Sequence, residues 1–129
     1  MSEQPGAADL VGTEVVHRCY VSAAHAHYAG DLVDGAWGLG LFGDVATEMC
    51  IRTDGDEGLF ASYDDVQFLA PVRAGDVVEA VARLVRVGRR SRGMEFELRV
   101  VARGATGSAS QVLGEPLVAT TARGTVVVP

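Results

Sequence analysis

The sequence predicts an α+β domain in which an antiparallel β-sheet wraps around one long central helix. Residues 36–52 carry apolar side chains at helical spacing around most of the circumference. The flanking segments are rich in β-branched residues, alternate in part, and are separated by Gly, Pro and Asp turns. The 129 residues have room for one domain with a core, so we expect residues 1–129 to form a single domain, with 1–10 as a loose leader.

A strand and an ordered loop are expected before the helix. Residues 13–22 are rich in β-branched and aromatic side chains, which favours a first strand. Residues 24–35 mix turn-forming residues with side chains capable of chemistry. We therefore expect a structured loop that leads the chain into the helix.

The helix must be buried, because an apolar surface this wide cannot face water. Asp34 is placed to cap its start, and the pair Asp54 and Gly55 favours a stop. The segment also contains three glycines, Gly38, Gly40 and Gly43. Each costs a helix up to about 1 kcal/mol relative to Ala, so we expect another backbone to approach closely there.

Four strands are expected after the helix, at residues 59–70, 77–87, 94–102 and 117–128. They are separated by turns at residues 71–76 and 88–91 and by a loop rich in Gly, Ser and Ala at residues 103–115. Consecutive strands joined in this way favour an antiparallel meander.

One apolar helix wrapped by one sheet is the hotdog fold. The competing split βαβ arrangement needs a second helix, and no other segment has helical periodicity. Because such a sheet covers its helix on one side only, we expect a homo-oligomer, either a dimer or a dimer-based hexamer, with the site at the subunit interface.

The charge balance excludes several classes of function. The chain has 11 basic and 17 acidic residues, and 11 − 17 gives a net charge of −6, which argues against non-specific binding to nucleic acid or anionic membranes. All the basic residues are arginines, so a Schiff base with pyridoxal phosphate is impossible. No apolar stretch approaches the ~20 residues of a membrane helix, and residues 1–9 lack the features of a signal peptide, so we expect a cytoplasmic protein.

The two cysteines, Cys19 and Cys50, are interpreted as reduced packing residues, because they do not form a Cys-x-x-Cys pair. A structural zinc site needs about four Cys or His ligands at suitable spacing. The sequence does not offer them, so no metal site is expected.

Asp44 and Glu48 are the first candidates for catalysis. They lie four residues apart on the predicted helix and therefore project from one face. One interpretation is that they form the solvent-facing stripe of the helix, or that one of them pairs with an arginine such as Arg52. The alternative is that they line a cleft, where desolvation raises a carboxyl pKa and suits it to general acid or base catalysis.

The loop before the helix holds a second group of candidates, His27, Tyr28 and Asp31. Each of them could equally be a surface residue. Their position beside a helix start adds a further possibility, because the free N–H groups of Gly35 and Ala36 could stabilise an oxyanion.

Three arginines, Arg89, Arg90 and Arg92, cluster with Ser91 around a predicted turn. In an acidic protein this is the one obvious positive patch, and guanidinium groups suit phosphate binding. The other interpretation is a solvated hairpin end.

Several of these motifs resemble those of known enzymes. The segments Phe-Leu-Ala-Pro-Val-Arg-Ala-Gly-Asp-Val-Val-Glu at residues 68–79 and Val-Gly-Arg-Arg-Ser at 87–91 resemble the strand-turn-strand of hotdog acyl-CoA enzymes. His-Tyr-Ala-Gly-Asp-Leu-Val-Asp-Gly-Ala at 27–36, Leu-Phe-Gly-Asp-Val-Ala-Thr-Glu at 41–48 and Asp-Gly-Asp-Glu-Gly-Leu-Phe at 54–60 resemble the β-aminoacyl-CoA ammonia-lyases. The resemblance extends from about residue 21 to the end of the chain.

The resemblance implies reversible loss of ammonia from a β-aminoacyl-CoA, without a cofactor other than the CoA of the substrate. Such a reaction needs a base for the Cα proton, a stabilised enolate oxygen and a group that handles the departing ammonium. Glu48 or Asp44 would be the base, and the other carboxylate or Asp31 would hold the ammonium. His27 and Tyr28 would shape the site.

Two alternatives remain open, an acyl-CoA thioesterase and a non-catalytic acyl-CoA-binding module. Many hotdog thioesterases place their acid seven residues after the second Gly of a Gly-Gly pair. Here Asp44 comes nine residues after Gly35, and Phe42 occupies the seventh position. This spacing weakens the thioesterase interpretation.

Overall fold

The computed structural model of the chain describes residues 6–104 and 109–129. Its strands are β1 (Glu14–Tyr20), β2 (Ala26–Tyr28), β3 (Leu32–Val33), β4 (Leu59–Phe68), β5 (Val72–Arg73), β6 (Val77–Val87), β7 (Ser91–Gly104) and β8 (Ser110–Val127). Its helices are α1 (Gly35–Asp54) and the short 3-10 turns Ala7–Leu10, Ala23–His25 and Ala29–Asp31.

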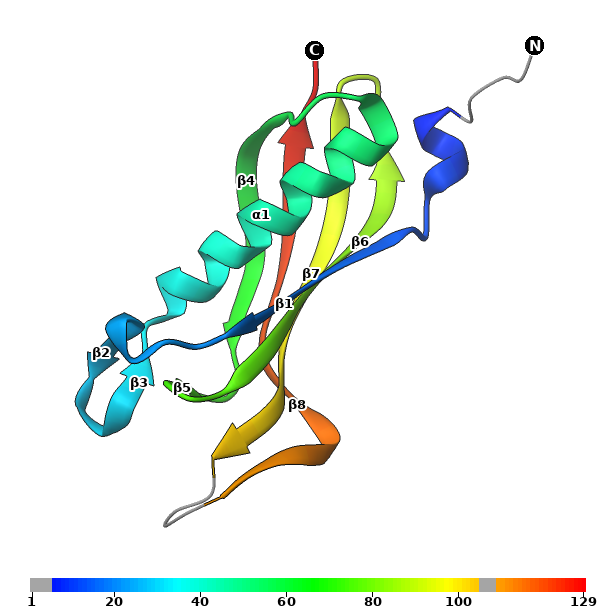
Figure 1. Cartoon of the computed structure of the whole chain (residues 1–129). Coiled ribbons are helices and arrows are strands. Elements are labelled where there is room, and N and C mark those ends of the chain that lie inside the picture. The colour runs from blue at the N-terminus through cyan, green and yellow to red at the C-terminus, as the bar shows by residue number, and fades with distance from the viewer. Residues whose placement is uncertain (1–5, 105–108) are drawn as a thin grey trace.

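The main sheet has five strands in the order β1-β6-β7-β8-β4, and every pairing in it is antiparallel. Helix α1 lies across one face of this sheet (Figure 1). A small second sheet, in the order β2-β3-β5, lies beside the start of α1. The predicted fold class, one long helix against an antiparallel sheet, is confirmed.

The core lies between α1 and the sheet. On β6 and β7, alternate side chains face the helix, and these are buried: Val78, Ala80, Ala82, Leu84, Met94, Phe96, Leu98 and Val100. From α1, Phe42 stacks on Phe96 with ring centroids 5.1 Å apart. Burying a side chain of this size contributes about 2 kcal/mol, so this layer holds the helix on the sheet.

The predicted four-strand meander is wrong for β4. Strands β6, β7 and β8 pair consecutively, but β4 pairs with β8, for example Phe60 with Val126. The chain then leaves this edge through β5, which pairs with β3 beside the start of α1, before it enters β6. The strand that follows the helix therefore closes the far edge of the sheet.

The loop expected at residues 103–115 is also largely wrong. Strand β7 continues to Gly104 and β8 begins at Ser110, with Ala102 opposite Val112. The two strands pair with each other here, so backbone hydrogen bonds maintain a ribbon that the small side chains alone do not indicate. Residues 105–108 lie outside the described part of the chain.

The expected leader is partly ordered. Residues 7–10 form a 3-10 turn, and Leu10 packs against the core. Residues 1–5 lie outside the described residues, so the expectation of a loose leader stays a prediction for them.

The turn before β6 is held by a buried ion pair. Asp76 is only 1% exposed and accepts hydrogen bonds from Arg103 Nε at 3.0 Å and from the Arg73 amide at 2.9 Å. Gly75 has φ +92°, a conformation that favours glycine. The Gly-Asp pair of the acyl-CoA-enzyme motif is thus explained here by the geometry of the turn.

Helix α1 ends as predicted and begins without the predicted side-chain cap. Gly55 adopts φ +66°, and its amide donates to the carbonyl of Ile51 at 2.9 Å. Asp34 is the N-cap residue, but its carboxylate accepts no capping hydrogen bond. Among the described residues, no helix is long and apolar enough to cross a membrane.

The glycines of α1 meet different surroundings. A Cβ on Gly38 would lie 2.9 Å from Leu98 Cδ2, so this glycine allows the helix to approach the sheet. A Cβ on Gly40 or Gly43 would have nothing within 4 Å. The close backbone approach expected at these two positions is therefore not made by any residue of the described ranges.

Candidate active site

A pocket of about 450 Å³ opens at the N-terminus of α1. Its walls come from the β2–β3 region, the first turn of the helix, the end of β4 and the inner face of the sheet. Apolar side chains dominate these walls, among them Trp37, Phe68, Leu69 and Leu98. We call this space the helix-start pocket.

Gly35, one of the two residues expected to bind an oxyanion, lines the helix-start pocket. A Cβ on Gly35 would overlap the ring of Phe68, so glycine is needed for the ring to form the wall. The amide of Trp37 donates to the carbonyl of Asp34, whereas the amides of Gly35 and Ala36 make no hydrogen bond with the described residues. These two N–H groups carry the partial positive charge of the helix start.

The predicted loop residues do not all lie at the helix-start pocket. Tyr28 lines the helix-start pocket, and His27 packs edge-on against the Tyr28 ring with centroids 4.8 Å apart. Asp31 is exposed, has φ +60° and does not line the pocket. Its backbone carbonyl accepts a hydrogen bond from the amide of Ala74, so it holds the loop in place.

Glu48 is held by two basic side chains. Its Oε1 lies 2.8 Å from His17 Nε2 on β1, and its Oε2 accepts a hydrogen bond of 2.8 Å from Arg52 Nε, four residues on. The hydrogen bond to His17, and next the one to Arg52, lower the pKa of Glu48. The expected rise of a carboxyl pKa by desolvation is thus wrong for Glu48, and the pairing with Arg52 is confirmed.

Asp44 projects from the same face of α1 but into different surroundings. Its side chain is exposed and makes no hydrogen bond or ion pair with the described residues. Across from it, the Tyr63 hydroxyl donates to the carbonyl of Leu39 at 2.7 Å. Burial, and then the negative charge of Asp44, raise the pKa of Tyr63.

The arginine cluster is split by the fold. Arg89 and Arg90 are exposed at the β6–β7 turn, and Ser91 Oγ accepts a hydrogen bond of 3.1 Å from Arg86. Arg92 instead points inward and is only 6% exposed. The expectation that Arg92 holds a phosphate therefore needs correction.

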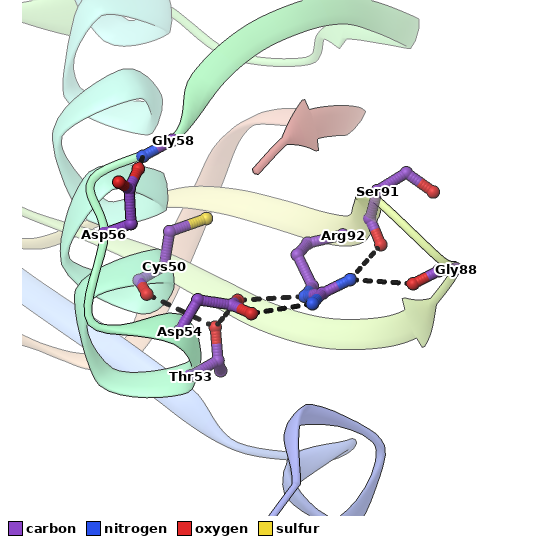
Figure 2. Close-up of polar contacts among 8 residues, drawn as sticks. All are labelled: Cys50, Thr53, Asp54, Asp56, Gly58, Gly88, Ser91 and Arg92. Atoms are coloured by element: carbon purple, nitrogen blue, oxygen red, sulfur yellow. Dashed lines mark hydrogen bonds and ion pairs between the residues drawn. The ribbon is translucent and has the colours of Figure 1, made fainter. Parts of the chain in front are cut away.

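Arg92 forms a buried ion pair with Asp54 at the end of α1 (Figure 2). Its Nε and Nη2 donate to the two carboxylate oxygens at 2.9 and 2.7 Å, and its Nη1 donates to the carbonyls of Gly88 and Ser91. The hydrogen bond from Arg92 lowers the pKa of Asp54. The hydrogen bonds of the Arg92 guanidinium therefore join the end of α1 to the β6–β7 turn.

The two cysteines are free thiols, Cys50 buried and Cys19 half-buried. Burial raises the pKa of Cys50 to about 11, so its thiol stays protonated at neutral pH. Among residues 6–104 and 109–129, no group of three or more His, Cys, Asp or Glu side chains could hold a metal ion.

The predicted site residues do not all meet within one chain. The 20 residues of α1 span about 30 Å, with the helix-start pocket at one end and the Arg89–Arg90 turn near the other. Asp44 follows Gly35 by nine residues, which corresponds to roughly 13 Å along the helix axis. Neither Asp44 nor Glu48 lines the helix-start pocket.

Sequence reasoning missed three residues near these groups. His17 lies on β1 two residues after the buried Val15 and faces the helix. This alternation was the only feature of the sequence that indicated its inward position. Asp34 was expected only as a cap, yet it lines the helix-start pocket. Thr120 also lines this pocket. It lies two residues before the buried Ala122 on the same strand, so the alternation places a polar side chain on the inward face.

A second pocket, of about 400 Å³, is lined by charged residues of the sheet face away from α1, including Arg83, Glu95 and Arg123. It contains none of the predicted site residues.

Known proteins resemble this chain over most of its length. Residues 35–107 match the family model described as the thioesterase superfamily. The 3-aminobutyryl-CoA ammonia lyase of Acetoanaerobium sticklandii is 54% identical over 112 residues, which cover 84% of this chain and 89% of that protein.

Two solved structures superpose on most of this chain. The β-alanyl-CoA:ammonia lyase from Clostridium propionicum superposes with a TM-score of 0.88 at 36% identity, over 92% of this chain and 86% of that one. A hexameric thioesterase from Yersinia pestis superposes with a TM-score of 0.75 over 92% of this chain and 88% of that one. At 23% identity, the second likeness supports the fold alone.

Proposed function

The chain belongs to the β-aminoacyl-CoA ammonia-lyases within the thioesterase superfamily, and we propose that it reversibly eliminates ammonia from a short β-aminoacyl-CoA. The substrate would be 3-aminobutyryl-CoA or β-alanyl-CoA, and the product crotonyl-CoA or acryloyl-CoA. The observation that carries this proposal is the helix-start pocket, an apolar space large enough for a short acyl group. Gly35, whose amide is unpartnered, lines this pocket, whereas Ala36 is exposed and does not line it.

The elimination proceeds through an enolate. A base takes the proton from Cα, and the electron pair that is left behind is shared with the thioester oxygen. The pair then forms the Cα=Cβ bond as the Cβ–N bond breaks, its electrons leave on nitrogen as ammonia, and ammonia takes up a proton. The amide of Gly35, with that of Ala36 next to it, would donate to the enolate oxygen, because it is unpartnered and carries the partial positive charge of the helix start.

We assign the role of the Cα base to Asp44. Glu48 is already bound by His17 and Arg52, which lower its pKa and make it a weaker base. The Asp44 carboxylate makes no such bonds with the described residues. Glu48 would then act by positioning the middle of α1 against β1.

A second copy of the chain would complete the site. Asp44 and the helix-start pocket are separated along α1, whereas a two-fold axis near Gly40 would set the first turn of α1 in one copy opposite Asp44 of the other. The open space over Gly40 and Gly43, on the exposed side of α1, supports a partner helix there. We therefore propose a homo-oligomer, a dimer or a dimer-based hexamer, with the site at its interface.

The proposed site also includes residues that could bind the CoA part of the substrate. Arg89 and Arg90 are exposed and could bind its phosphates, with Ser91 beside them. No cofactor is needed beyond the CoA of the substrate, since the steps above use only carboxylate and amide groups. The free state of Cys19 and Cys50 supports a reducing compartment, and we propose the cytoplasm.

The proposal is tested by incubating the purified protein with crotonyl-CoA and ammonium. Mass spectrometry is expected to detect 3-aminobutyryl-CoA, and a parallel reaction with acryloyl-CoA covers the shorter substrate. If both enoyl-CoA substrates stay unchanged, the proposed function is wrong. A thiol reagent in the same reactions measures free CoA, whose release would instead support a thioesterase.

A further inference from the structure

Thr120 contributes an unusual hydroxyl to the helix-start pocket. The residue lies on β8, faces α1 and is only 4% exposed. Its hydroxyl makes no hydrogen bond with a described residue. No buried polar side-chain atom in the described part of the chain is fully enclosed without a partner, so the hydroxyl must open onto the pocket that Thr120 lines. A hydroxyl held this way is free to bond to a ligand, and a ligand that displaces water from it without offering a partner incurs a cost.

Asp34 brings a negative charge to the same space. It lines the helix-start pocket as the N-cap residue of α1, a position where an aspartate side chain ordinarily accepts a hydrogen bond from the helix. Here the carboxylate makes no such bond and no ion pair within the described residues. It is therefore an acceptor without a partner beside apolar walls.

We propose that Asp34 and Thr120 form the subsite that binds the β-ammonium group of the substrate. This inference rests on the proposed function and deepens it. An ammonium group has three donors and no acceptor, and a carboxylate and a hydroxyl supply acceptors for it. The amides of Gly35 and Ala36 lie beside Asp34 in the chain, so one short acyl group can place its carbonyl on the amides and its ammonium on Asp34.

The subsite replaces the role expected of Asp31. Asp31 is exposed and lies outside the pocket, whereas Asp34 lines it. A substrate that fills the pocket would displace water between its apolar walls and so strengthen the attraction between the carboxylate and the ammonium. An acyl-CoA without an amine leaves both acceptors unpaired, so the subsite selects for the amine.

Binding measurements test the subsite without turnover. Calorimetry compares 3-aminobutyryl-CoA with butyryl-CoA, using Asp44→Asn as the parent protein so that the amino ester stays intact. Adding Asp34→Asn is expected to weaken binding of the amino ester at least ~10-fold and that of butyryl-CoA by no more than about 2-fold. Equal losses for both esters, or no loss for the amino ester, would overturn the inference.

Thr120→Val keeps the shape of the side chain and removes only the hydroxyl. Binding of the amino ester is expected to weaken by about 3- to 10-fold, with thermal stability unchanged or raised, because no hydrogen bond within the protein is lost. A lower melting temperature with an unchanged preference between the two esters would assign the hydroxyl a structural role and contradict the subsite.

Two matched variants control for indirect effects. Thr121→Val changes the neighbouring hydroxyl, which faces the other side of the sheet, and Asp64→Asn removes an exposed charge on β4. Both are expected to leave the preference for the amino ester intact. Turnover of crotonyl-CoA and ammonium by the unaltered protein is measured separately, as the test of the proposed function. If the unaltered protein is active but Asp34→Asn keeps the same preference for the amino ester, the subsite is contradicted and the proposed function is not.

Discussion

Glu48 and Asp54 are carboxylates of α1 with lowered pKa values, yet they differ in what they contribute to stability. The side chain of Glu48 is 35% exposed, so water screens its bonds to His17 and Arg52. Asp54 is 16% exposed and faces Arg92, whose side chain is 7% exposed. Removing one partner of such a buried pair leaves the other charge uncompensated.

Asp54→Asn is therefore expected to lower the free energy of unfolding by ~3 kcal/mol, measured by chemical denaturation. Because the folded-state pKa of Asp54 lies below its ordinary value of 3.8, the contribution of the pair is full above that value and is lost as pH falls through the folded pKa. The destabilisation by Asp54→Asn should accordingly shrink in strongly acidic buffer. Glu48→Gln serves as the control, and a loss as large as that of Asp54→Asn would contradict this assignment.

Asp44→Asn is expected to lower kcat at least ~10²-fold, because it removes the proposed Cα base and leaves the helix intact. Glu48→Gln should lower kcat by less, since Glu48 positions the helix and its lowered pKa makes it a poor base. Initial rates of enoyl-CoA consumption with ammonium measure both. A larger loss in Glu48→Gln than in Asp44→Asn would exchange the two roles.

At the scale of elements, the helix was the easiest to predict. The spacing of apolar residues indicated residues 36–52, and α1 spans Gly35–Asp54. The position of β4 could not be predicted, because side-chain alternation indicates that a strand exists but not which edge it joins. Bulges at two places in β4 further obscure its alternation.

The site residues, like the secondary-structure elements, could be predicted only in part. Gly35 and Tyr28 were found from motifs and do line the pocket. Thr120 could have been noticed as a polar residue at an inward position of the last strand. The contact of His17 with Glu48 depends on how α1 crosses the sheet, and no local pattern encodes that crossing.

The connection from α1 to β4 requires Gly58. Its φ is +67°, and a Cβ there would lie 2.7 Å from Val126 Cγ1 and 3.1 Å from the Val127 carbonyl oxygen. Gly58→Ala is expected to lower the free energy of unfolding by roughly 2 kcal/mol or more. Gly55→Ala is the control, because Gly55 has φ +66° but nothing within 4 Å of a Cβ, so it should cost about 1 kcal/mol. Equal losses in the two variants would rule out the steric contact as the cause.

At the scale of the whole molecule, the proposed site combines Asp44 of one copy with the helix-start pocket of another. Mixing Asp44→Asn subunits with Asp34→Asn subunits should restore activity, because a mixed dimer has one site in which both residues are intact. In mixed dimers purified through both tags, about half of the wild-type sites return. Differently tagged subunits, expressed together and purified through both tags, provide the measurement, and no recovery above the single variants would place both residues in one subunit.

The most direct test of the ammonia-lyase assignment is the reaction of crotonyl-CoA with ammonium in heavy water, followed by exchange of the labile hydrogens back into ordinary water. Because the base delivers a solvent-derived hydrogen to Cα as ammonia adds at Cβ, mass spectrometry should find 3-aminobutyryl-CoA that retains one carbon-bound deuterium. Free CoA as the main product, or recovery of unchanged crotonyl-CoA, would contradict the assignment.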